Sequence, residues 1–236
     1  MKALILNSGM GSRMGGLTSK HPKCMTEIAE GETILSRQLK LLQRCGLVEV
    51  VMTTGFFDKV LIDYCNSLNL PLKYVFIKNP IYDKTNYIYS IYLARDYLND
   101  TILMMHGDLV FELQVLQDVL KQEKSSMTVS STISLPPKDF KAVIKNGRIE
   151  KIGIEFFDNA MAAQPFYKLK KDDWKIWLDR IVKFCMSNQV SCYAEVAFNE
   201  ISDRCLIYPL DIDDLLCSEV DTPEDLMVVK NRIINL

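Results

Sequence analysis

Apolar and polar positions follow two different periods along the first half of the chain. Short apolar runs bounded by polar or glycine residues predict buried strands, and longer stretches with an apolar residue at every third or fourth position predict amphipathic helices. In the first such helix, Leu35, Leu39 and Leu42 share one face, and Gly46 follows where a helix commonly ends. The predicted strands are 2–6, 48–53, 72–77 and 101–105, and the predicted helices are 33–45, 57–68 and 85–98. This alternation is typical of a doubly wound, mostly parallel sheet.

The pattern changes in the second half of the chain, where predicted strands follow one another directly. Asn146-Gly147 is a strong signal for a hairpin turn, and Thr222-Pro223 is a typical start for the final helix. The predicted strands are 127–135, 140–144, 148–154 and 205–208, and an amphipathic helix is predicted over 172–185. Because the chain has no internal repeat and no linker, we expect one domain over 1–236. Its expected fold class is α/β, a three-layer α/β/α Rossmann-like fold in which about 127–205 forms a β-rich elaboration.

Composition and charge exclude several functional classes. Hydrophobic residues make up 48% and charged residues 25% of the 236 residues, as in soluble globular proteins. The 28 basic and 30 acidic residues nearly balance, which argues against a nucleic-acid binder. No apolar run approaches the roughly 20 residues of a membrane span. None of the seven cysteines lies in a C-x-x-C motif, so we expect reduced thiols in a cytoplasmic protein.

The chain has only two histidines, which leaves little for a catalytic triad or a histidine-rich metal site. His21 is expected to be a structural loop residue. His106, at the end of a predicted strand, is expected to pack in the core.

A glycine-rich loop over 7–16 follows the first predicted strand. Glycines let backbone N–H groups approach a phosphate, and the N-terminus of a following helix adds positive potential. Two familiar phosphate loops do not fit, because Met14 stands where the dinucleotide fingerprint requires glycine and Leu17 stands where the P-loop requires lysine. The pattern that fits is G-x-G-x-R at Gly9, Gly11 and Arg13, followed after eight residues by Pro22-Lys23.

This pattern resembles the signature of the nucleotidyltransferase superfamily that activates sugar phosphates and related small phosphates. Further segments are similar to the bacterial phosphocholine cytidylyltransferase branch of that superfamily: 17–27, 33–35, 53–55, 79–80, 83–92 and 161–164. The superfamily usually has two alanines before the first glycine, and this chain has Asn7-Ser8, a departure that concerns recognition of the base.

The resemblance implies a reaction and its partners. The expected reaction is Mg²⁺-dependent transfer of CMP from CTP to a small phosphorylated amide or amine, with phosphoglutamine favoured and pyrophosphate released. The alternatives are phosphocholine, 2-aminoethylphosphonate or a sugar 1-phosphate as the acceptor. We expect no nucleic-acid or membrane partner, and a monomer or homodimer.

The resemblance also implies roles for particular residues. Arg13 is expected to grip the β- and γ-phosphates with its planar guanidinium, and Lys23 is expected to stabilise the charge on the α-phosphate. No general base is required, because a phosphate monoester is already largely dianionic at neutral pH. The expected nucleotide-binding residues are Leu6, Asn7, Ser8, Gly9, Met10, Gly11, Ser12, Thr54, Gly55, Asn79, Thr85 and Asn86.

Three carboxylates are candidate metal ligands. Asp108 follows a predicted strand, at the edge where α/β sheets bind ligands. Glu219 and Asp221 are two positions apart, so in an extended segment they point to one face. The resemblance places such an acidic pair beside the position of Asp108, with Asp221 the stronger candidate. Asp221 could alternatively cap the final helix, and Glu219 could be a solvated charge.

The acceptor site has weaker signals. Gln164, Glu195 and Asn199 are polar residues in apolar surroundings, so they could contact an amide or ammonium group or could simply be surface residues. Four tyrosines could form a cage for a cation by cation–π attraction, or could pack along a helix, and we favour packing. They are Tyr82, Tyr87, Tyr89 and Tyr92.

Overall fold

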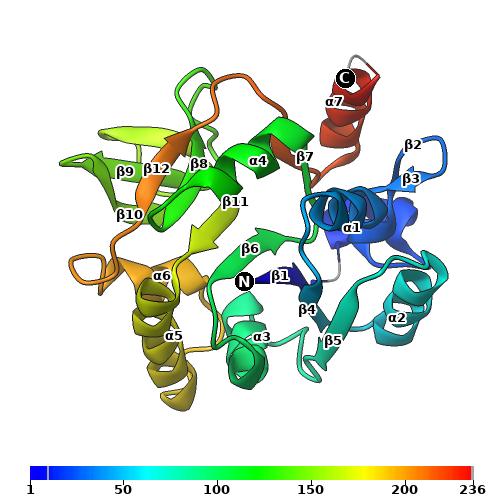
Figure 1. Ribbon diagram of the computed structural model, residues 1–236, viewed down its shortest axis with the longest axis horizontal. Coiled ribbons are helices and arrows are strands. Elements are labelled where there is room, and N and C mark those ends of the chain that lie inside the picture. The colour runs from blue at the N-terminus through cyan, green and yellow to red at the C-terminus, as the bar shows by residue number, and fades with distance from the viewer. Residues whose placement is uncertain (10, 235–236) are drawn as a thin grey trace.

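The computed structural model describes residues 1–9 and 11–234, and a nine-stranded sheet crosses this part of the chain (Figure 1). Its strands are β1 (Lys2–Asn7), β4 (Glu49–Thr54), β5 (Lys73–Lys78), β6 (Ile102–His106), β8 (Ser126–Ser130), β9 (Lys141–Lys145), β10 (Arg148–Gly153), β11 (Ala160–Leu169) and β12 (Tyr208–Asp211). The order is β10-β9-β11-β6-β1-β4-β5, with β8 also paired to β11 and β12 paired to β8.

The first half of the sheet is parallel. Strand β1 pairs in parallel with both β4 and β6, and β4 pairs in parallel with β5. Ala3, Leu4 and Ile5 of β1 are completely buried because this central strand is covered on both faces. Successive side chains alternate between the two sides, with Leu4 in one hydrophobic cluster and Ala3 and Ile5 in the other.

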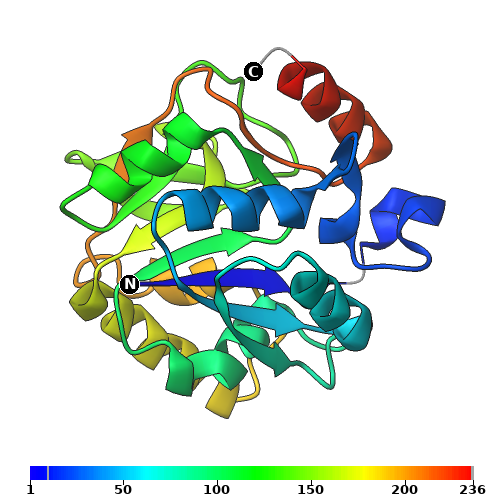
Figure 2. The ribbon, with the colours of Figure 1, turned by 45° about the vertical axis from the view of Figure 1, so that its right-hand side comes forward.

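Helices cover both faces, which confirms the expected three-layer α/β/α fold. Figure 2 shows α3 and α5 on the side of the sheet away from α1 and α4. One side has α1 (Ile34–Arg44), α2 (Asp58–Ser67) and α4 (Leu113–Lys121), and the other has α3 (Tyr87–Ala94), α5 (Lys171–Met186) and α6 (Ala194–Asn199). The last helix is α7 (Pro223–Ile233). Short 3₁₀ helices are η1 (Ser12–Thr18), η2 (Lys23–Met25) and η3 (Arg95–Tyr97).

The second half of the chain extends the same sheet in antiparallel fashion. Strand β11 pairs antiparallel with β6, β8 and β9, and β9 forms a hairpin with β10 through Asn146-Gly147. Both turn residues have positive φ angles, 52° and 73°, as an Asn-Gly hairpin turn requires. Two small ribbons complete the fold: β2 (Glu27–Ala29) with β3 (Glu32–Thr33), and β7 (Leu109–Phe111) with β13 (Cys217–Glu219).

Several element boundaries differ from those expected. The strand expected over 127–135 ends at Ser130, and the strand expected over 205–208 lies three residues later as β12. The helix expected over 85–98 begins two residues later as α3, where the side chain of the N-cap residue Asn86 accepts from the N–H of Tyr87 at 2.7 Å. The hydroxyl of Thr85 instead donates to the carbonyl of Ile81.

The start of α7 agrees with the sequence pattern and bears on the site. Thr222 caps the helix, accepting from the backbone N–H of Asp225 at 3.2 Å, while the Asp225 carboxylate accepts from Thr222 N–H at 2.8 Å. The side chain of Asp221 is therefore not used as the helix cap.

Candidate active site

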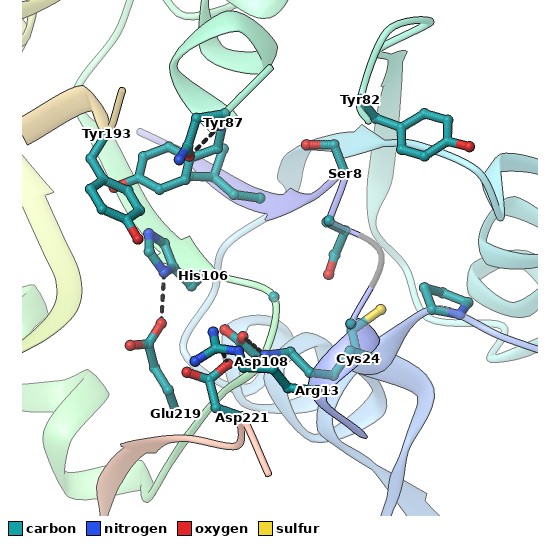
Figure 3. A pocket seen from close by; sticks show the side chains of 18 of the residues that line it. Ser8, Arg13, Cys24, Tyr82, Tyr87, His106, Asp108, Tyr193, Glu219 and Asp221 are labelled. Carbon is teal, nitrogen blue, oxygen red and sulfur yellow. Dashed lines mark hydrogen bonds and ion pairs between the residues drawn. The ribbon is translucent and has the colours of Figure 1, made fainter. Parts of the chain in front are cut away.

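The carboxyl ends of β1 and β6 open into a cavity of about 380 Å³. Parallel strands present their carboxyl ends at one edge of the sheet, which is where α/β folds commonly bind ligands. The cavity is lined by Leu6, Asn7, Ser8, Gly9, Gly11, Arg13, Pro22, Lys23, Cys24, Tyr82, Thr85, Asn86, Tyr87, His106, Gly107, Asp108, Lys138, Asp139, Phe140, Ile154, Tyr193, Glu219 and Asp221. Figure 3 shows that these side chains converge from the two halves of the chain.

The glycine loop forms one wall of the cavity. Gly11 has φ 65°, and a Cβ atom at this position would lie 3.0 Å from Cβ of Lys23. The loop can therefore rest on the stem of Lys23 only because residue 11 is glycine. The loop is shorter than expected, because η1 begins at Ser12 in place of a loop to Gly16. Met10, an expected nucleotide-binding residue, lies outside the described residues.

Charged side chains meet at the centre of the cavity. The ammonium of Lys23, on η2, is paired with the carboxylates of Asp108 and Asp221, the latter at 2.5 Å. Arg13 reaches the same Asp221 oxygen at 2.9 Å. Lys23 is largely buried, with 14% of its side chain exposed, whereas 64% of the Arg13 side chain is exposed. The structure thus brings the predicted catalytic cations and two of the predicted metal ligands into one cluster (Figure 3).

The pKa values in this cluster follow from its pairing. Burial alone would lower the pKa of Lys23, but attraction to Asp108 and Asp221 outweighs it and raises the pKa above its usual value. Burial alone would raise the pKa of Asp108, but Lys23 and His106 lower it below its usual value. Lys23 is therefore charged and Asp108 ionised at neutral pH.

His106 does not pack in the core as expected. It lines the cavity at the end of β6, and its Nδ1 lies 2.7 Å from Oε1 of Glu219 on β13 (Figure 3). Burial alone would lower the pKa of His106, but the Glu219 carboxylate outweighs it and raises the pKa to about 9. At neutral pH the ring is an imidazolium that donates to Glu219.

The acidic cluster can hold a divalent cation. Asp108 and Asp221 already share one cation, the Lys23 ammonium, so their oxygens lie within reach of a single ion. Ligand atoms of His106, Asp108 and Glu219 also lie within 4.8 Å of one another. Of these two sets, the Asp108 and Asp221 oxygens fit a hard cation better, because Mg²⁺ prefers oxygen ligands and the His106 ring is engaged with Glu219.

Aromatic rings line the cavity beside His106. The Tyr87 ring lies 4.8 Å from the His106 ring and 5.8 Å from the Tyr193 ring, and Phe140 lies 5.0 Å from Tyr193, centroid to centroid. We call Tyr87, Phe140 and Tyr193 the aromatic wall. Tyr193 and Phe140 were not found from the sequence, because no local motif marks them and only the fold brings them to Tyr87.

The four tyrosines considered for a cation cage divide into two pairs. Tyr89 and Tyr92 stack on each other at 5.7 Å and pack against the core, as the packing interpretation predicts. Tyr82 and Tyr87 line the cavity, so packing alone does not describe them.

The three predicted acceptor residues do not line the cavity. Glu195 is 1% exposed and lies behind the aromatic wall, where its carboxylate accepts from the hydroxyls of Tyr87 and Tyr167. The Asn199 side-chain amide accepts from the N–H of Ile152 at 2.8 Å and donates to the carbonyl of Ile152 at 2.9 Å. Gln164 is a half-buried residue of β11. Glu195 supports a residue of the cavity, and Asn199 joins α6 to β10.

Other predicted nucleotide-binding residues lie in the cavity lining or next to it. Thr85 and Asn86 line the cavity, and Asn79 lies buried behind them, donating to the hydroxyls of Thr85 and Ser90 at 2.9 and 3.1 Å. Ser8 joins this network through its hydroxyl contact with Ser90 at 2.7 Å. Thr54 and Gly55 line a smaller adjoining pocket together with Asn7 and Gly9.

Comparison with known proteins places the chain among nucleotidyltransferases. The model of the MobA-like NTP transferase domain matches residues 3–136. The CMP-5'-(3-aminopropyl)phosphonate synthase of Streptomyces rubellomurinus is 31% identical over 131 residues, which cover 56% of this chain and 21% of that protein. The CTP:phosphoglutamine cytidylyltransferase of Campylobacter jejuni is 28% identical over 160 residues, which cover 64% of this chain and 62% of that protein. In each case the match spans less than two thirds of the relative's length.

Solved structures share the fold over nearly the whole chain. The CTP:phosphocholine cytidylyltransferase from Streptococcus pneumoniae has a TM-score of 0.79 at 17% identity, covering 98% of both chains. The inositol-1-phosphate CTP transferase from T. maritima also has a TM-score of 0.79, at 20% identity, covering 98% of this chain and 95% of that one. At such low identity these likenesses show the fold alone. No helix in the described part of the chain combines the length and the hydropathy that a membrane crossing demands.

Proposed function

The chain belongs to the family of MobA-like NTP transferase domains, and from this premise we propose that it transfers CMP from CTP to a small phosphorylated acceptor. The single observation that carries the proposal is the cluster at the centre of the cavity. A phosphate-type glycine loop, two cations and two carboxylates meet there, at the carboxyl ends of β1 and β6. CTP is the proposed donor because the relatives above include proteins named for CMP or CTP.

The cations of the cluster suit a triphosphate. Arg13 is mostly exposed at the mouth of the cavity, so its guanidinium can turn from Asp221 to the β- and γ-phosphates and bind two oxygens at once. Lys23 lies deeper, beside Gly11, where its ammonium can meet the α-phosphate. At that position the Lys23 ammonium would stabilise negative charge on the α-phosphate oxygens.

The chemical step requires no proton transfer. A phosphate oxygen of the acceptor attacks the α-phosphorus, a new P–O bond forms, and the bond to the β-phosphate oxygen breaks with its electron pair leaving on pyrophosphate. The acceptor phosphate is largely dianionic at neutral pH and needs no base to activate it. The residues of the cavity therefore act by holding the two reactants in line.

Asp108 and Asp221 are the proposed holders of Mg²⁺. Their oxygens suit this ion, which takes a few carboxylates and completes its shell with water and substrate phosphate oxygens. Bound there, Mg²⁺ supplies neutralisation of the triphosphate charge. Glu219 was the third predicted ligand. Because its carboxylate pairs with His106, we propose that it supports the site without being one of the two principal metal ligands.

The acceptor is proposed to bind along the aromatic wall. Phosphoglutamine is the favoured acceptor, because one relative is named for it. A second candidate class is an alkylammonium phosphate or phosphonate, such as phosphocholine or 2-aminoethylphosphonate. Tyr82, Tyr87 and Tyr193 line the cavity, which supports this class because aromatic faces attract an ammonium group.

The proposal also includes the compartment. All seven cysteines are free thiols, which supports a reducing environment, and we propose a cytoplasmic enzyme acting as a monomer or homodimer.

A panel of substrates tests the function. Pyrophosphate release is measured with CTP, UTP and GTP against phosphoglutamine, phosphocholine, 2-aminoethylphosphonate and glucose 1-phosphate, each with Mg²⁺. We expect the highest kcat/KM with CTP and phosphoglutamine. Release with UTP or GTP but not CTP would overturn the choice of donor, and release with none of the acceptors would overturn the reaction.

A further inference from the structure

Lys23 stands in the place that a metal ion needs. Its ammonium contacts one oxygen of Asp108 and Oδ1 of Asp221, and these are the two carboxylates proposed above as metal ligands. Arg13 contacts the same Asp221 oxygen from the outside, at 2.9 Å. In this structure, one oxygen of each carboxylate is therefore paired with the protein's own cations.

Because Lys23 pairs with both carboxylates, we expect the site to bind a metal ion weakly when no nucleotide is bound. A divalent cation entering between Asp108 and Asp221 meets a fixed positive charge at close range, and repulsion between like charges is strong in a buried setting. Displacing Lys23 would leave an ammonium that is 14% exposed without its partners. Metal and ammonium therefore compete for the same two oxygens.

A nucleotide can release the site because the glycine loop adjoins Lys23. Gly11 packs directly on the Lys23 stem, since a Cβ atom on residue 11 would lie only 3.0 Å from Cβ of Lys23. A triphosphate seated on this loop would place phosphate oxygens beside the ammonium, and these are alternative partners for its N–H donors. Once Lys23 turns to the α-phosphate and Arg13 to the β- and γ-phosphates, Asp108 and Asp221 lose the cations that pair with them here.

We propose that Lys23 is an internal counter-ion that blocks the metal site of the free protein and releases it when a nucleoside triphosphate binds. The proposal rests on the proposed function, since it takes Asp108 and Asp221 as the metal ligands. Its consequence is a binding order in which metal enters with the nucleotide or after it. By thermodynamic linkage, nucleotide and metal then strengthen each other's binding by the same factor.

Direct binding of Mn²⁺ to the nucleotide-free protein tests this, with the electron paramagnetic resonance signal of free Mn²⁺ as the readout. We expect weak binding by the wild type and at least tenfold tighter binding by Lys23→Met, which removes the competing charge. The gain should vanish in the double variant Lys23→Met/Asp108→Asn. Arg13→Met is the matched control, because it removes a cation that contacts Asp221 alone, and we expect less than a threefold change.

Two results would overturn the proposal. One is equal Mn²⁺ affinity in the wild type and Lys23→Met, with both shown to be folded by circular dichroism. The other is a gain that persists in the double variant, which would place the extra Mn²⁺ elsewhere. Failure here is separable from failure of the proposed function: wild-type turnover of CTP without any gain in Lys23→Met would leave the reaction standing and remove only the counter-ion.

A measurement on the wild type covers the case in which Lys23→Met does not fold. Reductive methylation followed by peptide mass spectrometry reports how accessible the Lys23 amine is, because only a free, unprotonated amine reacts. We expect low labelling of Lys23 in the free protein and no increase on addition of Mg²⁺ alone. A several-fold increase with Mg²⁺ alone would show that the metal displaces Lys23 unaided, and would overturn the proposal.

Discussion

The side-chain oxygen of Asn7 fills the space beside Gly107 that a Cβ atom on residue 107 would occupy. The two residues lie at the ends of β1 and β6, and the N–H of Gly107 donates to the carbonyl of Leu6 at 3.0 Å. This contact fixes the spacing of the two strand ends that carry the glycine loop and Asp108.

We therefore expect Gly107→Ala to damage both stability and activity. Overpacking of this kind costs about 1–3 kcal/mol, and it would displace Asp108, the next residue. Thermal unfolding and pyrophosphate release measure the two effects. The double variant Asn7→Ala/Gly107→Ala removes the clashing amide and should recover much of the lost stability. Unchanged melting temperature and turnover in Gly107→Ala would contradict this account of the strand ends.

Lys23→Ala should lower kcat by about 10²–10³, as loss of a preorganised electrostatic group typically does. The expected cause is loss of the cation beside the α-phosphate, so the KM for the acceptor should change much less. Lys138→Ala is the matched control, because Lys138 also lines the cavity but pairs with neither Asp108 nor Asp221 among the interactions described above. Turnover of Lys23→Ala within tenfold of the wild type, about 1.4 kcal/mol of barrier, would remove Lys23 from the chemical step.

Tyr87→Phe should raise the KM for the acceptor about five- to tenfold while leaving the KM for CTP nearly unchanged. The hydroxyl of Tyr87 donates to the buried Glu195 carboxylate, and without this hydrogen bond the ring can shift from its place in the aromatic wall. Steady-state kinetics with each substrate varied in turn measures the split.

The control for this prediction is Tyr167→Phe. Tyr167 donates to the other oxygen of Glu195 at 2.9 Å but does not line the cavity. Tyr167→Phe should lower the free energy of unfolding about as much as Tyr87→Phe does, by about 1–3 kcal/mol, because each leaves a buried oxygen of Glu195 without its hydrogen bond. Its effect on the acceptor KM should be smaller. If both variants shift the two KM values equally, Tyr87 has no special relation to the acceptor.

A thiol reagent should modify at most two cysteines of the native protein, Cys45 and Cys192, which are partly exposed. The other five are buried, and burial raises the pKa of Cys65 to about 12 and of Cys185 to about 11, so almost no reactive thiolate exists there at neutral pH. Titration with Ellman's reagent should count two thiols or fewer in buffer and seven in denaturant. Rapid modification of a third thiol in the folded state would show that one of the buried sites opens.

Local sequence signals predicted the parallel half of the fold well. Apolar runs gave β1, β4, β5 and β6 to within a residue or two; β1, β4 and β6 are buried on both faces, and the edge strand β5 is partly buried along its length. No strand was predicted over β11. Its stretch includes Pro165, which cannot donate a ladder hydrogen bond, and the pairing with β8 is irregular between Ala163 and Tyr167.

The site residues that could be predicted are those marked by a motif, by the end of a strand, as Asp108 is, or by the family resemblance, as Asp221 is. The glycine loop, Arg13 and Lys23 lie close together in the sequence, so their spacing could be recognised. Tyr193, by contrast, is brought to Tyr87 by the fold alone, and the role of Glu195 depends on burial. A buried carboxylate that holds two tyrosines cannot be distinguished in a sequence from a solvated one.

The boundary between β6 and β11 divides the sheet into a parallel part and an antiparallel part. On one side of it, the parallel strands carry the glycine loop and Asp108, and the family match, which ends at residue 136, extends past them through β8. On the other side, Phe140 and Tyr193 come from later segments. The proposed acceptor contacts at Phe140 and Tyr193 can therefore diversify by replacement of these later segments, provided that Asp221, which also lies beyond the match, is retained. A chimera of related chains should keep 219–221 together with the glycine loop.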